Sequence, residues 1–392
     1  MISVEDALSR CLDLVTPLPA EPVALRHAVG RWMASPATAL RDQPPFAVSA
    51  MDGYAVQGDA APGTTYTVIG KAGAGHAFSG VLLPGSAIRI FTGAPLPTGA
   101  NRVVIQEDVD VQADEITLKR KADTATHIRS AGQDFRVGDT VSPRLLRPND
   151  LALLASMNVP TLNCTRRPVI AIIATGDELV MPGEQPRHDQ IIASNGFTIA
   201  ALAEQTGATA RLLPIARDTI DDLVTVLTLA AGADLVVTIG GASVGDHDLL
   251  AEAASRLGFE QAFWRIAMRP GKPLMAGRLS GVPMLGLPGN PVSAIICTHL
   301  FVLPMLRAML GQPDPAPKPC RAILAGDTGP AGPRTHYMRA RLHPRVGLPG
   351  ITPYDRQDSS LLTVLASADA LLIRPADDGP VSCGTEVAYL PL

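Results

Sequence analysis

The sequence predicts a multidomain chain in which an open α/β domain is flanked by β-rich regions. Its 392 residues exceed the usual size of one domain. From Pro168 to Gly311, short β-branched runs alternate with segments of helical period, as in the βαβ units of a parallel sheet. Elsewhere, short β-branched segments are separated by glycine and proline. We therefore expect an open parallel sheet, a small mixed β domain, an elongated linker region and a C-terminal β module.

The composition indicates a globular chain without a strong charge. Hydrophobic residues make up 46% of the chain, and the net charge of −4 gives no positive field for nucleic acid. The five cysteines form no Cys-x-x-Cys pair, and MISVEDALSR lacks a signal pattern. These features favour a reducing compartment, so we expect a cytoplasmic protein. The long apolar run Val292–Leu310 contains polar residues and Pro304, which predicts a buried, kinked helix and no membrane span.

The N-terminal part begins with an amphipathic helix over residues 3–16, where Ser3 and Asp6 resemble a capping box. Residues 1–20 are assigned to this helix and its exit. Residues 21–44 and 143–167 are expected to form the elongated linker region, with a short helix over Leu151–Met157 capped by Asn149 or Asp150. Residues 45–142 predict the β-rich domain, with strands at Tyr66–Ile69, Ala87–Phe91, Val103–Gln106 and Glu115–Leu118.

The α/β domain is expected over residues 168–311. Its strands are predicted at Val169–Ala174, Thr209–Ile215, Asp234–Ile239 and Val282–Leu287, and its helices at Phe197–Gln205, Ile220–Ala230 and Asp248–Leu257. Ligands of such sheets bind outside the carboxyl ends of the strands. A proline-rich linker follows Gly311, and residues 318–392 predict a β-barrel-like module.

The most informative stretch is Val236–Asp248, VVTIGGASVGDHD. A buried strand ends there in three glycines, Gly240, Gly241 and Gly245, which allow close approach of a ligand. The start of the next helix favours an anion, but Asp246 and Asp248 would repel one. A bound cation would resolve this conflict. Because Asp246 can also be a helix cap, Asp248 is the preferred functional residue.

Other polar loops are expected at the same sheet edge. They carry the acids Asp177, Glu178 and Asp218, and the polar or cationic residues Ser194, Asn195, Ser243, Lys272, Asn290 and Ser293. Carboxylates favour a hard cation such as Mg²⁺, whereas lysine, hydroxyls and glycine N–H groups favour an oxyanion. No P-loop or Gly-x-Gly-x-x-Gly pattern is present. The residues alone predict a Mg²⁺-dependent enzyme for a phosphorylated or oxyanionic small molecule, although Asp218 could equally be a helix cap.

Seven motifs, in order and spacing, resemble the molybdopterin molybdenumtransferase family, which is related to the gephyrin E domain. They are AMDGYAV (50–56), FTGAPLP (91–97), SAGQDF (130–135), ATGDEL (174–179), GGASVGDHD (240–248), RPGKP (269–273) and LPGNPVS (287–293). Each motif alone is compatible with an ordinary turn. Together they cover nearly the whole chain, and the set is specific.

The resemblance implies an elongated homodimer with four subdomains per chain and the N-terminal helix docked on the α/β molybdopterin-binding domain. It implies an active site between the α/β domain of one protomer and the AMDGYAV-bearing β domain of the other. The implied reaction inserts molybdate into adenylylated molybdopterin and releases AMP, with Mg²⁺ as cofactor. The alternatives are a molybdopterin adenylyltransferase and a non-enzymatic pterin-binding or scaffold protein.

The resemblance also assigns residues. The implied catalytic acids are Asp52, Asp134, Glu178, Asp218 and Asp248, of which Glu178, Asp218 and Asp248 would hold Mg²⁺. The implied substrate contacts are Thr92, Ser194, Asn195, Gly240, Gly241, Ser243, Gly245, Arg269, Lys272, Asn290, Ser293 and Arg339. Two departures from the family pattern are Ala47-Val48, where a polar pair is usual, and Arg269, where lysine is usual. Arginine keeps the charge and can grip an oxyanion with two N–H groups.

Overall fold

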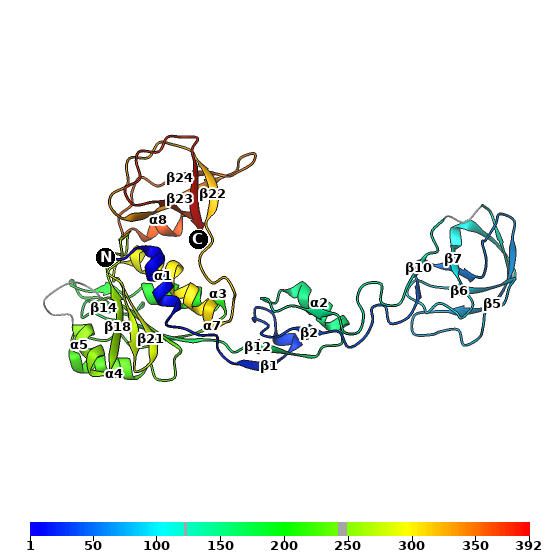
Figure 1. Cartoon of the computed structure of the whole chain (residues 1–392), viewed down its shortest axis with the longest axis horizontal. Coiled ribbons are helices and arrows are strands. Elements are labelled where there is room, and N and C mark those ends of the chain that lie inside the picture. Colours follow the sequence, from blue (N-terminus) through cyan, green and yellow to red (C-terminus); the bar gives the residue numbers. More distant parts are fainter. Residues whose placement is uncertain (121–123, 242–248) are drawn as a thin grey trace. The chain divides into compact units, whose positions relative to one another are not determined.

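The computed structural model describes residues 1–120, 124–241 and 249–392 (Figure 1). It divides into two compact units. We call Pro22–Cys164 the inserted unit, because the other unit is made of Met1–Glu21 and Thr165–Leu392, the two segments that flank it in the chain. We call that second unit the discontinuous unit.

The centre of the discontinuous unit is a six-stranded sheet. Its strand order is β16 (Thr209–Leu212), β13 (Val169–Ala174), β17 (Leu235–Ile239), β21 (Val282–Leu287), β20 (Met275–Leu279) and β18 (Phe259–Trp264). The first four strands are parallel, which confirms the predicted α/β class. Strand β20 runs antiparallel to both of its neighbours, β21 and β18, so β18 has the same direction as the first four strands. The difference has a local cause. Ser280 and Gly281, with φ of 48° and 84°, form a two-residue turn that closes β20 and β21 into a hairpin.

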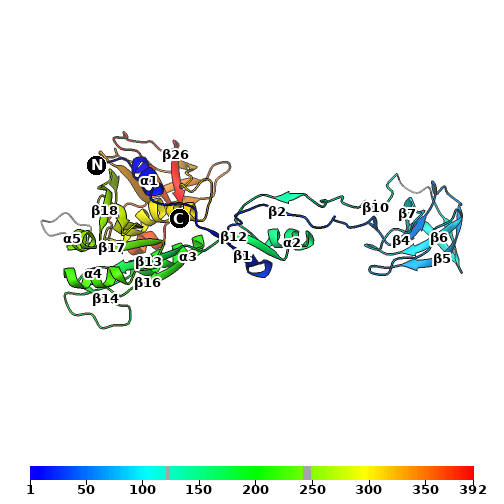
Figure 2. The same cartoon turned by 60° about the horizontal axis from the view of Figure 1, so that its bottom comes forward.

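Helices cover both faces of this sheet (Figures 1 and 2). One face carries α1 (Val4–Leu12), α3 (Asn195–Thr206), α6 (Pro291–Cys297) and α7 (Leu303–Met309), and the other carries α4 (Ile220–Thr228) and α5 (Leu249–Arg256). Strand β13 serves both cores, because Ile170 and Ile172 pack on the first face and Ala171 and Ile173 on the second. This alternation explains why the strand has apolar residues at every position.

The first and the longest helices both pack into the core. Ser3 accepts a hydrogen bond from the Asp6 N–H at 3.0 Å and starts α1, which contacts α7 and β18 and ends before the predicted residue 16. Helices α6 and α7 are joined by a π-helical turn, Thr298–Val302, just before Pro304. By length and composition alone Pro291–Met309 could cross a membrane, but 83% of its apolar window is buried inside the protein. It is therefore a core helix.

The C-terminal module is a small closed barrel. It contains β22 (Cys320–Leu324), β23 (Thr335–His343), β24 (Gly350–Pro353), β25 (Ala370–Arg374) and β26 (Glu386–Pro391), with α8 (Leu362–Ala366) between strands. Strand β23 pairs with both β24 and β25, which closes the ring. Strand β19 (Met268–Arg269) pairs with β23 in parallel, so the RPGKP segment is joined to the barrel.

The inserted unit has two parts. The linker part contains η1 (Leu25–His27), α2 (Pro148–Ser156) and two strand pairs, β1 (Ala20–Ala24) with β12 (Thr161–Thr165) and β2 (Ala37–Thr38) with β11 (Thr140–Val141). The β part has a sheet of β7 (Arg102–Ile105), β4 (Gly53–Val56), β6 (Ser86–Ile90), β5 (Thr65–Ala72), β9 (Glu115–Leu118) and β8 (Val109–Gln112), and a pair β3 (Val48–Ser49) with β10 (Ile128–Arg129). A 3₁₀ turn η2 (Gln106–Asp108) links β7 to β8.

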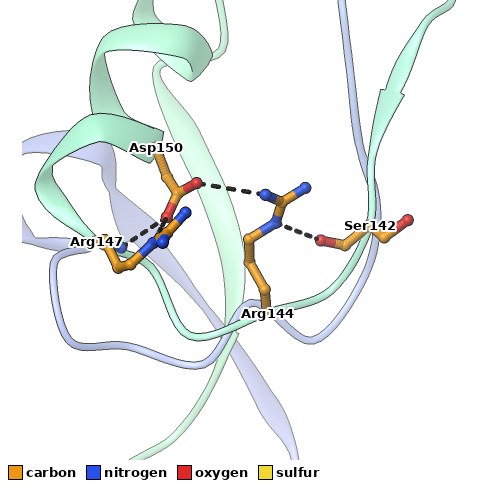
Figure 3. Close-up of polar contacts among 4 residues, drawn as sticks. All are labelled: Ser142, Arg144, Arg147 and Asp150. Carbon is orange, nitrogen blue, oxygen red and sulfur yellow. Dashed lines mark hydrogen bonds and ion pairs between the residues drawn. The ribbon is translucent and has the colours of Figure 1, made fainter. Parts of the chain in front are cut away.

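The N-cap of helix α2 is not the residue that the sequence predicted (Figure 3). Arg147, and not Asn149 or Asp150, is the N-cap, because Pro148 occupies the first helical position, where no N–H is needed. The carboxylate of Asp150 reaches back to accept the Arg147 N–H at 2.8 Å and pairs with Arg144 at 3.4 Å. Arg144 also donates to the carbonyl of Ser142 at 3.2 Å.

Candidate active site

A pocket of about 830 Å³ opens at the carboxyl ends of β13, β17 and β21. We call it the strand-end pocket. Seven of the predicted site residues line it: Glu178, Ser194, Asn195, Asp218, Gly240, Gly241 and Asn290. It therefore lies where ligands of open α/β sheets bind.

Two loops of the pocket are tied together by their acids. The Asp218 N–H donates to Asp177 Oδ1 at 3.2 Å, and the Asp177 N–H donates to Asp218 Oδ2 at 3.4 Å. Helix α4 is capped by Thr219, whose hydroxyl accepts the Asp222 N–H at 3.3 Å. Asp218 is therefore not the cap of α4, and that alternative prediction is wrong. Asp218 is exposed and lines the strand-end pocket.

Glu178 is held by its own loop. Its carbonyl accepts the Ile191 N–H at 2.7 Å, next to the short parallel pair β14 (Leu179–Val180) and β15 (Ile191–Ile192). Its carboxylate folds over Gly176, which has φ of 143°, and a Cβ placed on Gly176 would lie 2.3 Å from Glu178 Oε2. The glycine thus makes room for the acid.

The glycine turn after β17 is also sterically required. Gly240 and Gly241 have φ of 95° and 67°, in the left-handed region. A Cβ on Gly240 would lie 2.8 Å from the carbonyl oxygen of Thr175. The turn therefore brings the backbone of two strands together at the floor of the pocket.

Asn195 leaves a hydrogen-bond acceptor unused. Its Nδ2 donates to the carbonyl of Gly289 at 2.8 Å, whereas its Oδ1 is buried without a partner. Neither Ser194, the N-cap of α3, nor Asn290, the N-cap of α6, forms a side-chain capping bond. Because buried polar atoms are normally satisfied, the unpaired Asn195 Oδ1 is available to a ligand. The Ser194 and Asn290 side chains are at least partly exposed and have no capping role, so they are available as well.

Four predicted contacts do not line the strand-end pocket as the structure describes it. Arg269 and Lys272 are exposed on the RPGKP segment, and Ser293 is only 4% exposed inside α6. Arg339 is 1% exposed in β23, and its guanidinium donates to the carbonyl of Asp358 at 2.8 Å and to Gln357 Oε1 at 3.1 Å. Its hydrogen bonds hold the loop of the barrel around Gln357.

That loop supplies a pocket residue that the sequence analysis missed. Ser360 lines the pocket, and Asp358 Oδ1 accepts hydrogen bonds from its N–H and hydroxyl at 2.9 and 2.6 Å. The Val292 N–H donates to the carbonyl of Ser359 at 3.1 Å, which ties the loop to α6. The polar run Asp358-Ser359-Ser360 was the only signal in the sequence.

The RPGKP segment lies in a cationic environment. Burial and the nearby charges of Arg269 and Arg339 lower the pKa of His336 to about 4, so this histidine is neutral at pH 7. Its Nε2 is buried without a hydrogen-bond partner. Arg269 and His336 face each other in register where β19 pairs with β23.

The inserted unit holds the remaining predicted residues. Asp52 Oδ1 accepts hydrogen bonds from the Thr92 N–H at 2.7 Å and the Thr92 hydroxyl at 2.8 Å, and these bonds lower the pKa of Asp52. Asp134 lines a second cleft, of about 590 Å³, which we call the inserted-unit cleft. It is lined by Gln43, Pro44, Pro45, Phe46, Val48, Gly93, Arg129, Gln133 and Asp134.

Three predicted residues, Ser243, Gly245 and Asp248, lie outside the described residues, as does Asp246. Within residues 1–120, 124–241 and 249–392, no group of three or more His, Cys, Asp or Glu side chains is placed to hold a metal ion. Of the three Mg²⁺ ligands expected from the sequence, the described residues therefore include only Glu178 and Asp218, which both line the strand-end pocket.

An α/β domain with a pocket at its strand ends, followed by a closed barrel and carrying an inserted β unit, defines a class of multidomain α/β proteins. Residues 2–158 match the MoeA N-terminal region (domain I and II), residues 171–308 a probable molybdopterin binding domain, and residues 321–392 the MoeA C-terminal region (domain IV). The chain therefore belongs to the molybdopterin molybdenumtransferase (MoeA) family, which are enzymes of molybdenum cofactor biosynthesis.

Individual relatives agree over the full length. The chain is 34% identical over 380 residues to molybdopterin molybdenumtransferase 2 of Mycobacterium tuberculosis, covering 93% of each chain. It is 32% identical over 399 residues to molybdopterin molybdenumtransferase of Haemophilus influenzae, covering 100% of this chain and 98% of the other. The crystal structure of a molybdopterin biosynthesis MoeA protein from Pyrococcus horikosii superposes with a TM-score of 0.86 at 28% identity, covering 100% and 99%. These matches confirm the resemblance and the fold class.

Proposed function

We propose that this chain inserts molybdate into adenylylated molybdopterin and releases AMP, in a reaction that needs Mg²⁺. The observation that carries the proposal is the strand-end pocket, where the carboxylates of Glu178 and Asp218 lie with glycine backbone and the unsatisfied amide oxygen of Asn195. Two carboxylates and an unpaired amide oxygen are all electron-pair donors, so a bound cation would satisfy them together. A substrate with a phosphoanhydride meets that requirement, because its phosphate oxygens share the cation with the protein.

The donor set fits Mg²⁺. This ion binds oxygen ligands, usually through one or two carboxylates, and completes its shell with water and substrate phosphates. Glu178 and Asp218 would supply the carboxylates. When bound, Mg²⁺ would neutralise negative charge on the phosphate oxygens as the anhydride opens. We keep Asp248 in the proposed set on the strength of its motif, together with Ser243 and Gly245 as substrate contacts.

The remaining residues have proposed roles that follow their chemistry. Ser194, Asn195 and Asn290 would hydrogen-bond the substrate at the pocket, and Gly240 and Gly241 would let it approach the backbone. Arg269 and Lys272, both exposed cations, would attract the anionic substrate and molybdate. Arg339 would act indirectly, by holding the loop that carries Ser360. Ser293 would support the start of α6.

AMP release tests the reaction. The purified chain is incubated with adenylylated molybdopterin and Mg²⁺, with and without molybdate, and free AMP is measured. We expect release to depend on molybdate and to fall in Glu178→Gln and Asp218→Asn. If AMP stays bound at every molybdate concentration, the transferase proposal is wrong. An adenylyltransferase would instead consume ATP, and a scaffold protein would tolerate loss of both acids.

We further propose that the active site is shared between the two protomers of a homodimer. The proposed acids divide between the units, with Asp52 and Asp134 in the inserted unit and Glu178 and Asp218 in the discontinuous unit. Mixing two inactive variants tests the sharing. If Asp52→Asn and Glu178→Gln chains exchange subunits, half the dimers are mixed and each has one intact shared site, so about a quarter of the activity should return. A site within one chain would show no recovery.

A further inference from the structure

The inserted-unit cleft is a built feature made from three segments of the chain. The Gly132 N–H donates to the carbonyl of Pro44, and the Asp134 N–H to that of Gln43, both at 2.9 Å. Strands β3 and β10 pair Val48 with Arg129. Its volume of about 590 Å³ lies within the range of small-molecule sites. The backbone bonds hold the walls in place without a ligand.

The polar side chains of the cleft are uncommitted. Arg129, Gln133 and Asp134 all line it, yet in the described part of the chain none of their side chains forms a hydrogen bond or an ion pair. Arg129 and Asp134 have opposite charges and still do not pair. A cation, an amide and a carboxylate are therefore all free to contact a ligand in the same cleft.

The apolar lining of the cleft contains an exposed aromatic residue. Phe46 is 47% exposed, whereas Pro44 and Pro45 are half-buried and Val48 is buried. An aromatic ring left to solvent beside prolines can stack on a planar ring of a ligand. The wall and the polar groups together select a flat heteroaromatic molecule with hydrogen-bonding edges.

The charges of Arg129 and Asp134 favour one pattern of hydrogen-bond donors and acceptors on the edge of the ligand ring. Arg129 can only donate, whereas the Asp134 carboxylate can only accept, and it can take two N–H groups at once. A 2-amino-4-oxopyrimidine ring presents a carbonyl acceptor followed by two N–H donors along one edge, which complements this pair. Adenine has no carbonyl for the arginine and has a ring-nitrogen lone pair where a carboxylate would need a donor.

We propose that the inserted-unit cleft binds the aminopyrimidinone edge of the pterin ring, with Asp134 on its two N–H donors, Arg129 on its carbonyl and Phe46 under its face. This assignment rests on the proposed function, which makes a pterin the substrate. Gly93 lines the cleft and follows Thr92, the hydrogen-bond partner of Asp52. Asp52 and Thr92 do not line the cleft themselves, so the hydrogen-bonded pair would lie beside the bound ring without contacting it.

Binding of free pterin to the full-length chain tests the proposal without any turnover. Pterin fluorescence is titrated with protein, and lumazine, in which a carbonyl replaces the 2-amino group, is the matched ligand. We expect pterin to bind at least about tenfold more tightly than lumazine, because the carbonyl of lumazine faces the carboxylate. Asp134→Asn should weaken pterin and favour lumazine, since an introduced amide can donate to that carbonyl. Arg129→Ala should weaken both, because both have the 4-carbonyl.

Controls separate this site from others. Asp114→Asn removes an exposed acid of the same unit outside the cleft and should leave pterin binding unchanged. No pterin binding, equal affinity for lumazine, or loss of pterin binding in Glu178→Gln but not in Asp134→Asn would overturn the assignment. The experiment contains no molybdate, Mg²⁺ or nucleotide. Failure of AMP release with selective pterin binding would thus reject the reaction alone, and the reverse result would reject the cleft alone.

Discussion

Gly176→Ala should disable the strand-end pocket by moving one carboxylate. The introduced Cβ would lie 2.3 Å from Glu178 Oε2, whereas an ordinary contact needs about 3.5 Å. Because the carboxylate is the flexible end of a side chain, it should move by about 1 Å while the backbone of the loop stays. A misplacement of that size can lower turnover roughly 100-fold.

The same substitution also strains the backbone, and this effect must be separated. Gly176 has φ of 143°, and alanine there should cost about 1–3 kcal/mol of folding free energy. Gly183 is the matched control: its φ is 93°, and a Cβ there would meet nothing within 4 Å. Gly183→Ala should therefore lose comparable stability and keep turnover within about threefold.

Two assays on each variant separate backbone strain from displacement of the Glu178 carboxylate. Thermal unfolding measures the strain, which should lower Tm by roughly 2–4 °C per kcal/mol. Molybdate-dependent AMP release, measured well below Tm, reports the pocket. Equal turnover in Gly176→Ala and Gly183→Ala would refute the reasoning, because it would mean that the position of the Glu178 carboxylate has no bearing on the reaction.

Three further predictions concern stability and reactivity. Asp150→Ala should lower the free energy of unfolding of the inserted unit by about 1–2 kcal/mol in denaturant titration, because the backbone N–H of the N-cap Arg147 and the side chain of Arg144 both lose the carboxylate that they bind. Burial raises the pKa of Asp234, but hydrogen bonds from Arg166 and Val169 outweigh it and lower the pKa overall, so this carboxylate stabilises the fold above pH of about 4 and the contribution disappears as the pH falls through its folded pKa. Asp234→Asn should accordingly lose about 1–3 kcal/mol at pH 7 and less in acid, and an equal loss at both pH values would contradict this. A thiol reagent should titrate the exposed Cys320 and Cys383 in the native chain and reach Cys11, Cys164 and Cys297 only after unfolding.

Local patterns predicted the elements whose own residues determine them. Strand β13 was predicted with its observed bounds, because it is buried on both faces and has apolar residues throughout. Helix α4 was predicted over Ile220–Ala230 and is observed over Ile220–Thr228. Strand β20 was missed, because MAGRL contains a glycine and an arginine and only its hairpin with β21 makes it a strand.

The candidate site was predictable only in part, for a similar reason. The loops after β13, β17 and β21 meet because parallel strands end at one edge, a rule that the order of the strands already implies. Ser360 reaches the pocket from another module, and its position depends on the contacts of Arg339 and Val292 with a distant loop. Ser293 is buried because its place in α6 turns it toward the core, which a motif alone does not specify.

The discontinuity of the chain has a consequence for synthesis. Helix α1 is translated before the inserted unit, whereas β18 and α7, which it contacts, are translated after that unit, and α7 is the last helix of the α/β domain. The inserted unit lies between α1 and these contacts in the sequence. It has hydrophobic cores of its own, so it can fold before the elements that pack against α1 have been translated. The apolar side of α1, with Val4, Ala7 and Cys11, therefore cannot reach its complete native burial until α7, which ends at Met309, has been translated. The nine-residue helix α1 therefore packs into its domain late in folding, and chaperones that bind short apolar segments could bind it before that step.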